Sequence, residues 1–186
     1  STDWLAGIYF ESRDIDLQRD FLDFDTFTDA QLSSKYQTKN LALFGETTTA
    51  LSDRVNLTVG LRVEQWDADY KDSSAVILDT DETLYGGKVV LDYQATDDQL
   101  LYARIARGYK SGGVNTDGTL NKAEREFDTE YQWAYELGSK SSLLDDSLQV
   151  RVAAFYNDRQ DMHIKDSIIP VGGPGAFVDY IVNAAE

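Results

Sequence analysis

Apolar and polar residues alternate along most of this chain with a period of two. The clearest stretch runs from residue 55 to residue 66, where one face carries Val55, Leu57, Val59, Leu61 and Val63. A helix would scatter these five side chains around its circumference, whereas a strand places them all on one side. The pattern therefore predicts a β-strand with one apolar face.

The same alternation recurs along the chain and predicts about eight strands. Several of them exceed the roughly 5–6 residues usual in globular proteins and reach the roughly 9–11 residues that a membrane-spanning strand needs. No run of about 18 apolar residues occurs, so no transmembrane helix is expected. The predicted strands cover residues 4–20, 37–50, 54–68, 84–96, 99–110, 131–143, 147–162 and 177–184.

Short and long connections alternate between these strands. The short ones, residues 51–54, 96–99 and 144–147, are rich in Asp and Ser, which favour tight turns. The long ones cover residues 21–36, 69–83, 111–130 and 163–176. In an up-and-down meander, alternate connections lie at opposite ends of the sheet. Outer-membrane barrels have this asymmetry, with short periplasmic turns and long extracellular loops.

The fold class predicted from these features is all-β, an antiparallel up-and-down meander in a transmembrane β-barrel. A soluble antiparallel sandwich also has a period of two and stays open as an alternative. Sandwiches usually combine short strands with Greek-key connections, and the strict alternation of long and short connections favours the barrel.

Composition narrows the possible partners. The formal net charge is −16 at pH 7, and such a surface repels phosphate backbones, so no nucleic-acid partner is expected. The chain has no Cys, which excludes disulfides and Cys-based zinc sites. Tyr, with 11 residues, leads the aromatic side chains. Tyr and Trp are the residues that settle at membrane–water interfaces.

No set of residues predicts catalysis, so we expect neither an enzyme nor a cofactor. The one histidine, His163, would need carboxylate partners from elsewhere to bind a metal. Asp145 and Asp146 are neighbours in a tight turn and do not face each other across a substrate. The glycine-rich residues 108–113 lack the spacing and the following helix of a phosphate loop.

Two acidic or polar segments raise the question of calcium. Residues 79–82 (DTDE) and 115–119 (NTDGT) supply the oxygen ligands that calcium prefers. Neither matches the complete calcium-loop pattern, and no helices flank them. Solvated loops without a metal are therefore expected.

Several segments together resemble TonB-dependent outer-membrane receptors. Residues 57–64 (LTVGLRVE) resemble a strand of that family, and they follow residues 43–46 (LFGE), which look like its preceding strand. One departure is Asp128-Thr129-Glu130, where the family often has a Pro-Glu pair. The further similar segments are residues 4–10 (WLAGIYF), 101–103 (LYA), 108–115 (GYKSGGVN), 135–140 (YELGSK), 153–156 (AAFY) and 181–184 (IVNA).

The resemblance implies that residues 1–186 form part of a 22-stranded barrel, with the plug domain absent from this stretch. Since the chain runs from Ser1 to Glu186 without a signal-peptide pattern, we expect it to be a piece of a longer protein. The family implies an outer-membrane receptor for energised uptake of a scarce nutrient, such as a ferric siderophore. Its partners would be the TonB complex, acting through the plug region, the nutrient ligand and outer-membrane lipid.

The polar faces of the strands supply the candidate ligand-binding residues. If Val55 to Val63 face lipid, the alternation points Arg62, Glu64 and Trp66 into the lumen, near the end with the long loops. The same reasoning adds Arg104, Tyr109 and Lys110. Basic and aromatic groups there could hold an anionic ligand such as a ferric chelate. The alternative is an ion-pair network in the lumen, joining Arg62 with Glu64 or Glu136.

Two other functions stay open from the sequence. A complete eight-stranded structural or adhesive barrel must close on itself, and the ending Asn183-Ala184-Ala185-Glu186 lacks the usual terminal aromatic. A secreted soluble β-protein that binds carbohydrate or calcium must cover the apolar face of residues 55–63 with a second sheet.

Overall fold

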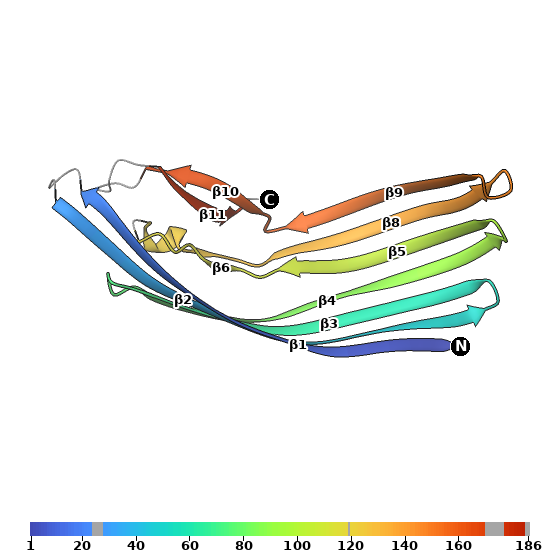
Figure 1. Cartoon of the computed structure of the whole chain (residues 1–186), viewed down its shortest axis with the longest axis horizontal. Helices are drawn as coiled ribbons and strands as arrows, with labels where there is room; N and C mark the ends of the chain where they lie inside the picture. The colour runs from blue at the N-terminus through green and yellow to red at the C-terminus, as the bar shows by residue number, and fades with distance from the viewer. Residues whose placement is uncertain (24–27, 119, 170–176, 185–186) are drawn as a thin grey trace.

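The computed structural model is an all-β chain dominated by one long, open, antiparallel sheet (Figure 1). It describes residues 1–23, 28–118, 120–169 and 177–184. The seven strands of the main sheet follow the order β1-β2-β3-β4-β5-β8-β9, so strands adjacent in the sheet also follow one another along the chain, with β6 and β7 left out of this sheet. Their bounds are Thr2–Asp23 (β1), Thr28–Ser52 (β2), Val55–Asp72 (β3), Ile77–Thr96 (β4), Gln99–Lys110 (β5), Glu130–Leu143 (β8) and Leu148–Gln160 (β9). The predicted meander is confirmed.

Three tight turns join strands at one end of the sheet, at the right of Figure 1. They connect β2 to β3, β4 to β5 and β8 to β9, as the positions of the acidic turn residues predicted. The third turn holds Leu144, Asp145 and Asp146 at φ values of 55°, 52° and 65°. Aspartate tolerates this left-handed conformation better than most residues because its short side chain bonds the local backbone, which explains its use here.

The strand register separates two faces of the sheet. Val59 lies opposite Val89, which lies opposite Ile105, and that residue lies opposite Tyr135. This outer face is apolar and uncovered, with Leu61 67% exposed and Val63 52% exposed. Within the described residues no second sheet covers it. The covered apolar face that a soluble sandwich requires is therefore not found.

The outer face changes from apolar to charged along β1–β4. Leu43, Val63 and Tyr85 lie opposite one another across three strands. Four residues further along each strand, on the same face, Lys39, Asp67 and Asp81 lie opposite one another in the same way. An apolar band bordered by charged residues matches the lipid-contacting zone of a barrel and the aqueous zone beyond it. We call the parts of β1–β4 beyond this band the protruding wall: residues 11–23, 28–40, 65–72 and 77–84.

The long connections predicted at residues 21–36 and 69–83 are largely wrong, because strands occupy most of both segments. β1 extends to Asp23, and β2 begins at Thr28. Polar pairs across the two strands support this extension: Gln31 donates to Asp20 and Gln37 donates to Asp14, both at 2.7 Å. Polar residues on the outer face predicted loops, although they lie on strands that extend beyond the lipid.

The turn between β3 and β4 is correspondingly short and is held by Asp72. Its Oδ1 accepts the backbone N–H of Ser74 at 2.9 Å and that of Val76 at 3.1 Å. Ala75 takes the left-handed conformation, with φ 62°. Residues 79–82, predicted as a possible loop, instead belong to β4.

An insertion between β5 and β8 folds back over the inner face of the protruding wall. It comprises β6 (Gly113–Val114), a 3-10 turn η1 (Lys122–Glu124) and β7 (Glu126–Phe127), which replace the loop predicted at residues 111–130. Val114 packs on Tyr70 and Leu78 in one buried cluster. This part of the core therefore lies between the insertion and the wall. Trp66, Ala68 and Leu84 form a second cluster on the wall, against which tyrosines of β2, β5 and β8 pack.

The chain after β9 forms a separate two-stranded hairpin of β10 (His163–Ile168) and β11 (Val178–Asn183). The eighth strand, predicted at residues 177–184, exists as β11, but it pairs with β10 and not with β9. Part of the loop predicted at 163–176 is β10, and residues 170–176 lie outside the described part. Among the described strands, β1 pairs only with β2, so the sheet does not close into an eight-stranded barrel.

Across the part of the chain that the structure describes, no helix has the length and apolar character needed to cross a membrane.

Candidate functional site

The inner face of the sheet carries a hydrogen-bonded network centred on Glu64. The Arg62 guanidinium contacts one carboxylate oxygen through Nη2 at 2.5 Å and Nε at 2.8 Å, and the Tyr109 hydroxyl donates to the same oxygen at 2.9 Å. Asn40 donates to the other oxygen at 2.8 Å. Glu64 is buried, and these donors satisfy it. We call these four residues the central network.

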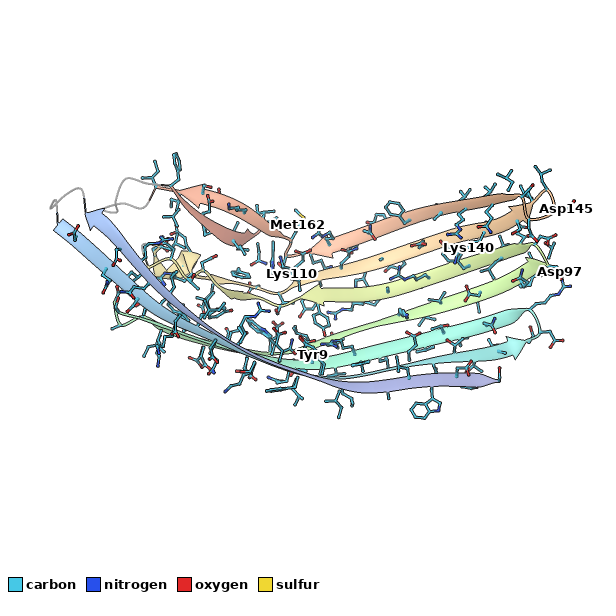
Figure 2. All side chains as sticks on the ribbon, viewed as in Figure 1. Tyr9, Asp97, Lys110, Lys140, Asp145 and Met162 are labelled. Atoms are coloured by element: carbon cyan, nitrogen blue, oxygen red, sulfur yellow. The ribbon has the colours of Figure 1, made fainter. Side chains whose placement is uncertain are left out.

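Two aromatic rings flank Arg62 as well. Its guanidinium carbon lies 5.3 Å from the centre of the Tyr9 ring and 5.9 Å from that of Phe44. Tyr9, labelled on β1 in Figure 2, also donates to Glu11 at 2.5 Å. Charge and ring contacts therefore fix Arg62, and its guanidinium is already engaged by the protein.

The combination of arginine, carboxylate and tyrosine recurs on the inner face. Glu136 accepts the Tyr102 hydroxyl at 2.5 Å and pairs with Arg104 at 3.8 Å. Of the two ion pairs considered from the sequence for Arg62, the one with Glu64 forms, whereas Glu136 is paired with Arg104. In each set the carboxylate offsets the positive charge of the arginine, and it also accepts a hydrogen bond from the tyrosine hydroxyl.

Glycines give the aromatic rings room along the inner wall. A Cβ at Gly7 would lie 2.4 Å from the tip of the Phe44 ring, and a Cβ at Gly138 would lie 2.4 Å from the Tyr102 ring. Each glycine is directly opposite the aromatic residue in the strand register. The rings therefore fill the space of the missing side chains and lie along the sheet.

A first hollow of about 530 Å³, which we call the lower hollow, is lined in part by Arg62 and Tyr109 of the central network. Four cationic side chains line it: Arg62, Lys88, Arg104 and Arg107. Lys88 pairs with Glu46 at 2.7 Å, and Arg107 lies over the rings of Tyr85 and Tyr131, 4.1 Å and 4.3 Å from their centres. All four cations therefore already have partners in the wall.

A second hollow, the upper hollow, has a volume of about 620 Å³ and lies among β1, the insertion and the hairpin. Its lining includes Arg19, Tyr36, Lys110, Asp117, Lys165 and Tyr180. Lys110 is exposed at the end of β5, where Figure 2 labels it, and it makes no ion pair with any described residue. It is a cation available to a ligand.

The other charges of the upper hollow are paired. Arg19 forms a short ion pair with Asp117, whose side chain is only 10% exposed against 47% for Arg19. Lys165 pairs with Asp179 at 2.5 Å. Hydrogen bonds from Lys165 and Ser167 lower the pKa of Asp179 below its ordinary value. This aspartate is therefore ionised at neutral pH.

Two asparagine side chains fasten the hairpin to the insertion. Asn115 exchanges two hydrogen bonds with the backbone of Ile181, both at 2.8 Å, in the manner of a ladder pair. Asn183 accepts the backbone N–H of Asp128 at 2.7 Å and donates to its carbonyl at 3.0 Å. Insertion and hairpin are thus joined across a long sequence separation.

His163 serves this junction too. Its backbone N–H donates to Glu130 at 2.8 Å, and its ring Nε2 lies 2.6 Å from the carbonyl oxygen of Asp128. The ring meets Phe127 edge-on, with centroids 5.0 Å apart. Among the described residues, no group of three or more His, Cys, Asp or Glu side chains is arranged to hold a metal ion. The polar segment 115–119 is described except for Thr119, and Asn115 uses its amide for the hairpin.

The residues selected from the sequence divide among three places. Arg62, Glu64 and Tyr109 meet in the central network, and Arg104 lines the same lower hollow with a partner of its own. Trp66 is buried in a cluster with Ala68 and Leu84, against which Tyr36, Tyr109 and Tyr131 pack. Lys110 lines the upper hollow.

Sequence reasoning missed several residues of the upper hollow, notably Arg19, Asn115, Asp117 and Lys165. The last three lie in segments predicted as loops, and Arg19 lies near the predicted end of a strand. Its partner Asp117 is 98 residues away. No local pattern indicates such a pairing, since it depends on how the insertion folds back over the sheet.

Comparison of the sequence with known proteins relates the chain to one family of receptors. The family model described as TonB dependent receptor-like, beta-barrel, matches residues 1–186. The pesticin receptor of Yersinia enterocolitica is 30% identical over 150 residues, which cover 75% of this chain and 21% of that protein. The pesticin receptor of Yersinia pestis is 29% identical over 142 residues, or 71% of this chain and 20% of the relative. The chain thus spans about a fifth of the length of these curated relatives.

Solved structures share the fold. The ferric yersiniabactin uptake receptor of Yersinia pestis superposes with a TM-score of 0.73 at 24% identity, covering 88% of this chain and 26% of that one. The ferric-catecholate import receptor of Escherichia coli K12 gives a TM-score of 0.70 at 15% identity, covering 96% of this chain and 30% of the other. At these identities the likeness shows a common architecture.

Proposed function

This chain belongs to the TonB-dependent receptor-like β-barrel family, and on that premise we propose that it forms part of the wall and the extracellular vestibule of a nutrient-uptake receptor. Members of this family are outer-membrane proteins, and this chain is part of such a barrel. The nutrient we propose is an anionic metal complex such as a ferric siderophore. The receptor acts as a transporter and not as an enzyme.

The outer surface supports the transmembrane part of this proposal. Large apolar side chains, such as Leu61, Leu137 and Val152, are exposed there, and a charged zone follows beyond them on β1–β4. A closed barrel can span lipid because closure pairs every backbone N–H and C=O. Residues 1–186 therefore supply a segment of wall whose edge strands would pair with further strands of the receptor.

The upper hollow carries the ligand-binding part of the proposal. The single observation behind it is Lys110, an exposed cation without an ion-pair partner among the described residues, in a hollow that Tyr36 and Tyr180 also line. A hollow that combines a cation with aromatic rings suits an anion with an aromatic or apolar body. We propose that Lys110 binds the ligand directly and that Arg104 contributes from the lower hollow. Arg62, Glu64, Tyr109 and Trp66 keep the wall beneath in shape.

The energy for uptake is proposed to come from the TonB complex. That partner would act on a plug region, which we propose lies outside residues 1–186. Outer-membrane lipid surrounds the apolar band, and the strongly negative charge disfavours nucleic acid.

A lysine comparison tests the ligand site in the full-length receptor that contains this chain. Lys110→Ala is expected to weaken binding of an iron(III) tris-catecholate trianion by about 10- to 150-fold, because a charge-assisted hydrogen bond contributes about 1.5–3 kcal/mol. Binding is measured by quenching of intrinsic fluorescence. Lys140→Ala is the matched control, since Lys140 stacks on Tyr102 near the short turns and lies outside the upper hollow. Equal effects of the two substitutions would reject the site.

A further inference from the structure

The ion pair between Arg19 and Asp117 lies within the upper hollow and joins two separate parts of the fold. Arg19 belongs to β1, whereas Asp117 belongs to the insertion. The two ends of the pair are unlike, because the carboxylate is nearly buried and the guanidinium is half exposed. An exposed guanidinium in a hollow can bind a carboxylate or phosphate through two parallel hydrogen bonds, that is, in bidentate geometry. Here a carboxylate of the protein itself occupies it.

The backbone around Asp117 is held firmly in place. The Asn115 N–H donates to the Arg125 carbonyl at 2.6 Å, and the Asp117 carbonyl accepts the Leu120 N–H at 3.3 Å. The Thr116 carbonyl lies 3.3 Å from the Tyr70 hydroxyl, whose proton it shares with Asp72. These contacts tie consecutive residues to the insertion and to β3. The Asp117 carboxylate is therefore presented by a rigid support, independently of Arg19.

Arg19 has neighbours that extend its positive potential into the hollow. Lys110 lines the same space and has no ion-pair partner among the described residues, and Lys165 lines it from the hairpin. A polyanion in the hollow could contact Lys110 with one anionic group while another competes with Asp117 for Arg19. Replacing one carboxylate by another at a guanidinium changes little free energy, so a ligand with a single weak anionic group gains little at this position.

We propose that Asp117 is a resident competitor: its carboxylate occupies the Arg19 anion site of the upper hollow until a multiply charged ligand displaces it. This inference rests on the proposed function, because it concerns the charge selectivity of the same hollow. Arg19 is then a ligand-binding residue, and Asp117 is the residue that raises the Kd for weakly charged ligands. Monoanions and neutral complexes are then disfavoured relative to polyanions.

If the Arg19–Asp117 ion pair had only a structural role, the Kd would change in the opposite direction, so the direction of the change decides between the two roles. If the pair only holds the insertion in place, Asp117→Asn loosens the hollow and weakens binding. If Asp117 is a competitor, Asp117→Asn frees Arg19 and strengthens binding. Asparagine keeps the shape of the side chain and its capacity to accept local hydrogen bonds, so the backbone support stays intact.

The experiment uses the full-length receptor and isothermal titration with inorganic pyrophosphate, a small polyanion that contains no iron. Asp117→Asn is expected to lower the Kd by about 10-fold, since a charge-assisted hydrogen bond to Arg19 becomes available. Arg19→Gln combined with Asp117→Asn is expected to abolish that gain. Asp16→Asn is the matched control, because it removes the same charge from another ion pair of β1, the one with Lys35 at 3.5 Å, which lies outside the upper hollow. Its Kd is expected to stay close to that of the unmodified receptor.

Three results would overturn the inference: an unchanged or higher Kd for Asp117→Asn, an equal gain for Asp16→Asn, or no pyrophosphate binding by any variant. A second titration with the iron(III) tris-catecholate trianion separates this inference from the proposed function. Pyrophosphate results as expected, together with no binding of the iron complex, would support the Arg19 site and reject the proposed ligand. Binding of the iron complex without the Asp117 effect would reject the competitor alone.

Discussion

Arg125 is the residue on which the attachment of the insertion to the wall depends. Its side chain is 2% exposed, and its partner Asp72 is completely buried. The guanidinium also contacts the Tyr70 hydroxyl at 3.1 Å and the Leu120 carbonyl at 3.1 Å. Burial and the hydrogen bond to Asp72 raise the pKa of Tyr70, although Arg125 opposes this shift. Tyr70 therefore stays protonated at physiological pH and continues to donate to Asp72.

Removing one partner of this buried pair should be costly. Arg125→Met leaves the Asp72 carboxylate buried without its cation, and such changes cost about 3–5 kcal/mol. We expect faster hydrogen–deuterium exchange in residues 113–118 and 120–127, with the central strands unaffected. The double variant Asp72→Asn/Arg125→Met should recover much of the loss, because asparagine removes the charge and keeps the oxygen that accepts from Ser74 and Val76. Equal exchange in the single and double variants would contradict this account.

Individual pairings could be predicted from the sequence only where the partners are close in one strand. Arg62 and Glu64 are two residues apart and share a face, so the alternation alone suggested their pairing. Tyr109 and Asn40 complete the same network from other strands. Arg125 reaches Asp72 across 53 residues. That contact depends on the folded path of the insertion, which no short-range pattern specifies.

The sequence predicted the strands better than any other element, but it underestimated the lengths of β1–β4. The apolar alternation identified the lipid-facing parts of β3, β5, β8 and β9 with boundaries close to those observed. In the protruding wall the outer face bears residues such as Asp67, Asp69 and Lys71. Without an apolar face toward lipid, these stretches look like loops. Their inner faces nevertheless pack against the insertion.

The position of the lipid boundary can be measured with arginine substitutions on one strand. Leu61→Arg places a cation in the apolar band of β3 and is expected to destabilise the receptor by about 2–4 kcal/mol. Asp69→Arg places the same residue on the same face beyond the band, opposite Asp79, and should cost about 1 kcal/mol or less. Urea unfolding in lipid vesicles measures both. Similar losses for the two variants would mean that the boundary lies elsewhere.

At the scale of the whole molecule, the sheet has two open edges among the described strands. β1 pairs only with β2, and β9 pairs only with β8. An unpaired strand presents backbone N–H and C=O groups that other chains can bind, and in lipid each unsatisfied group costs several kcal/mol. The meander topology was predictable from the alternating connections. The separate hairpin was not, because β10 lies in a segment that showed no strand pattern.

Residues 1–186 produced alone are therefore expected to self-associate in detergent. Size-exclusion chromatography with light scattering should show oligomers or aggregates, whereas the full-length receptor in the same detergent should run as a closed monomer. A monodisperse monomer of the isolated segment with heat-modifiable electrophoretic migration would contradict the expectation.

The glycines opposite Phe44 and Tyr102 set how far these aromatic rings project from the inner face of the wall. Each ring occupies the space where the side chain of Gly7 or Gly138 would be, so the aromatic groups lie along the wall and do not project toward the barrel axis. A methyl group at either position would collide with the ring and turn it away from the wall, toward the barrel interior. In the uptake receptor proposed above, the two missing methyl groups would thus leave a bulky ligand more clearance.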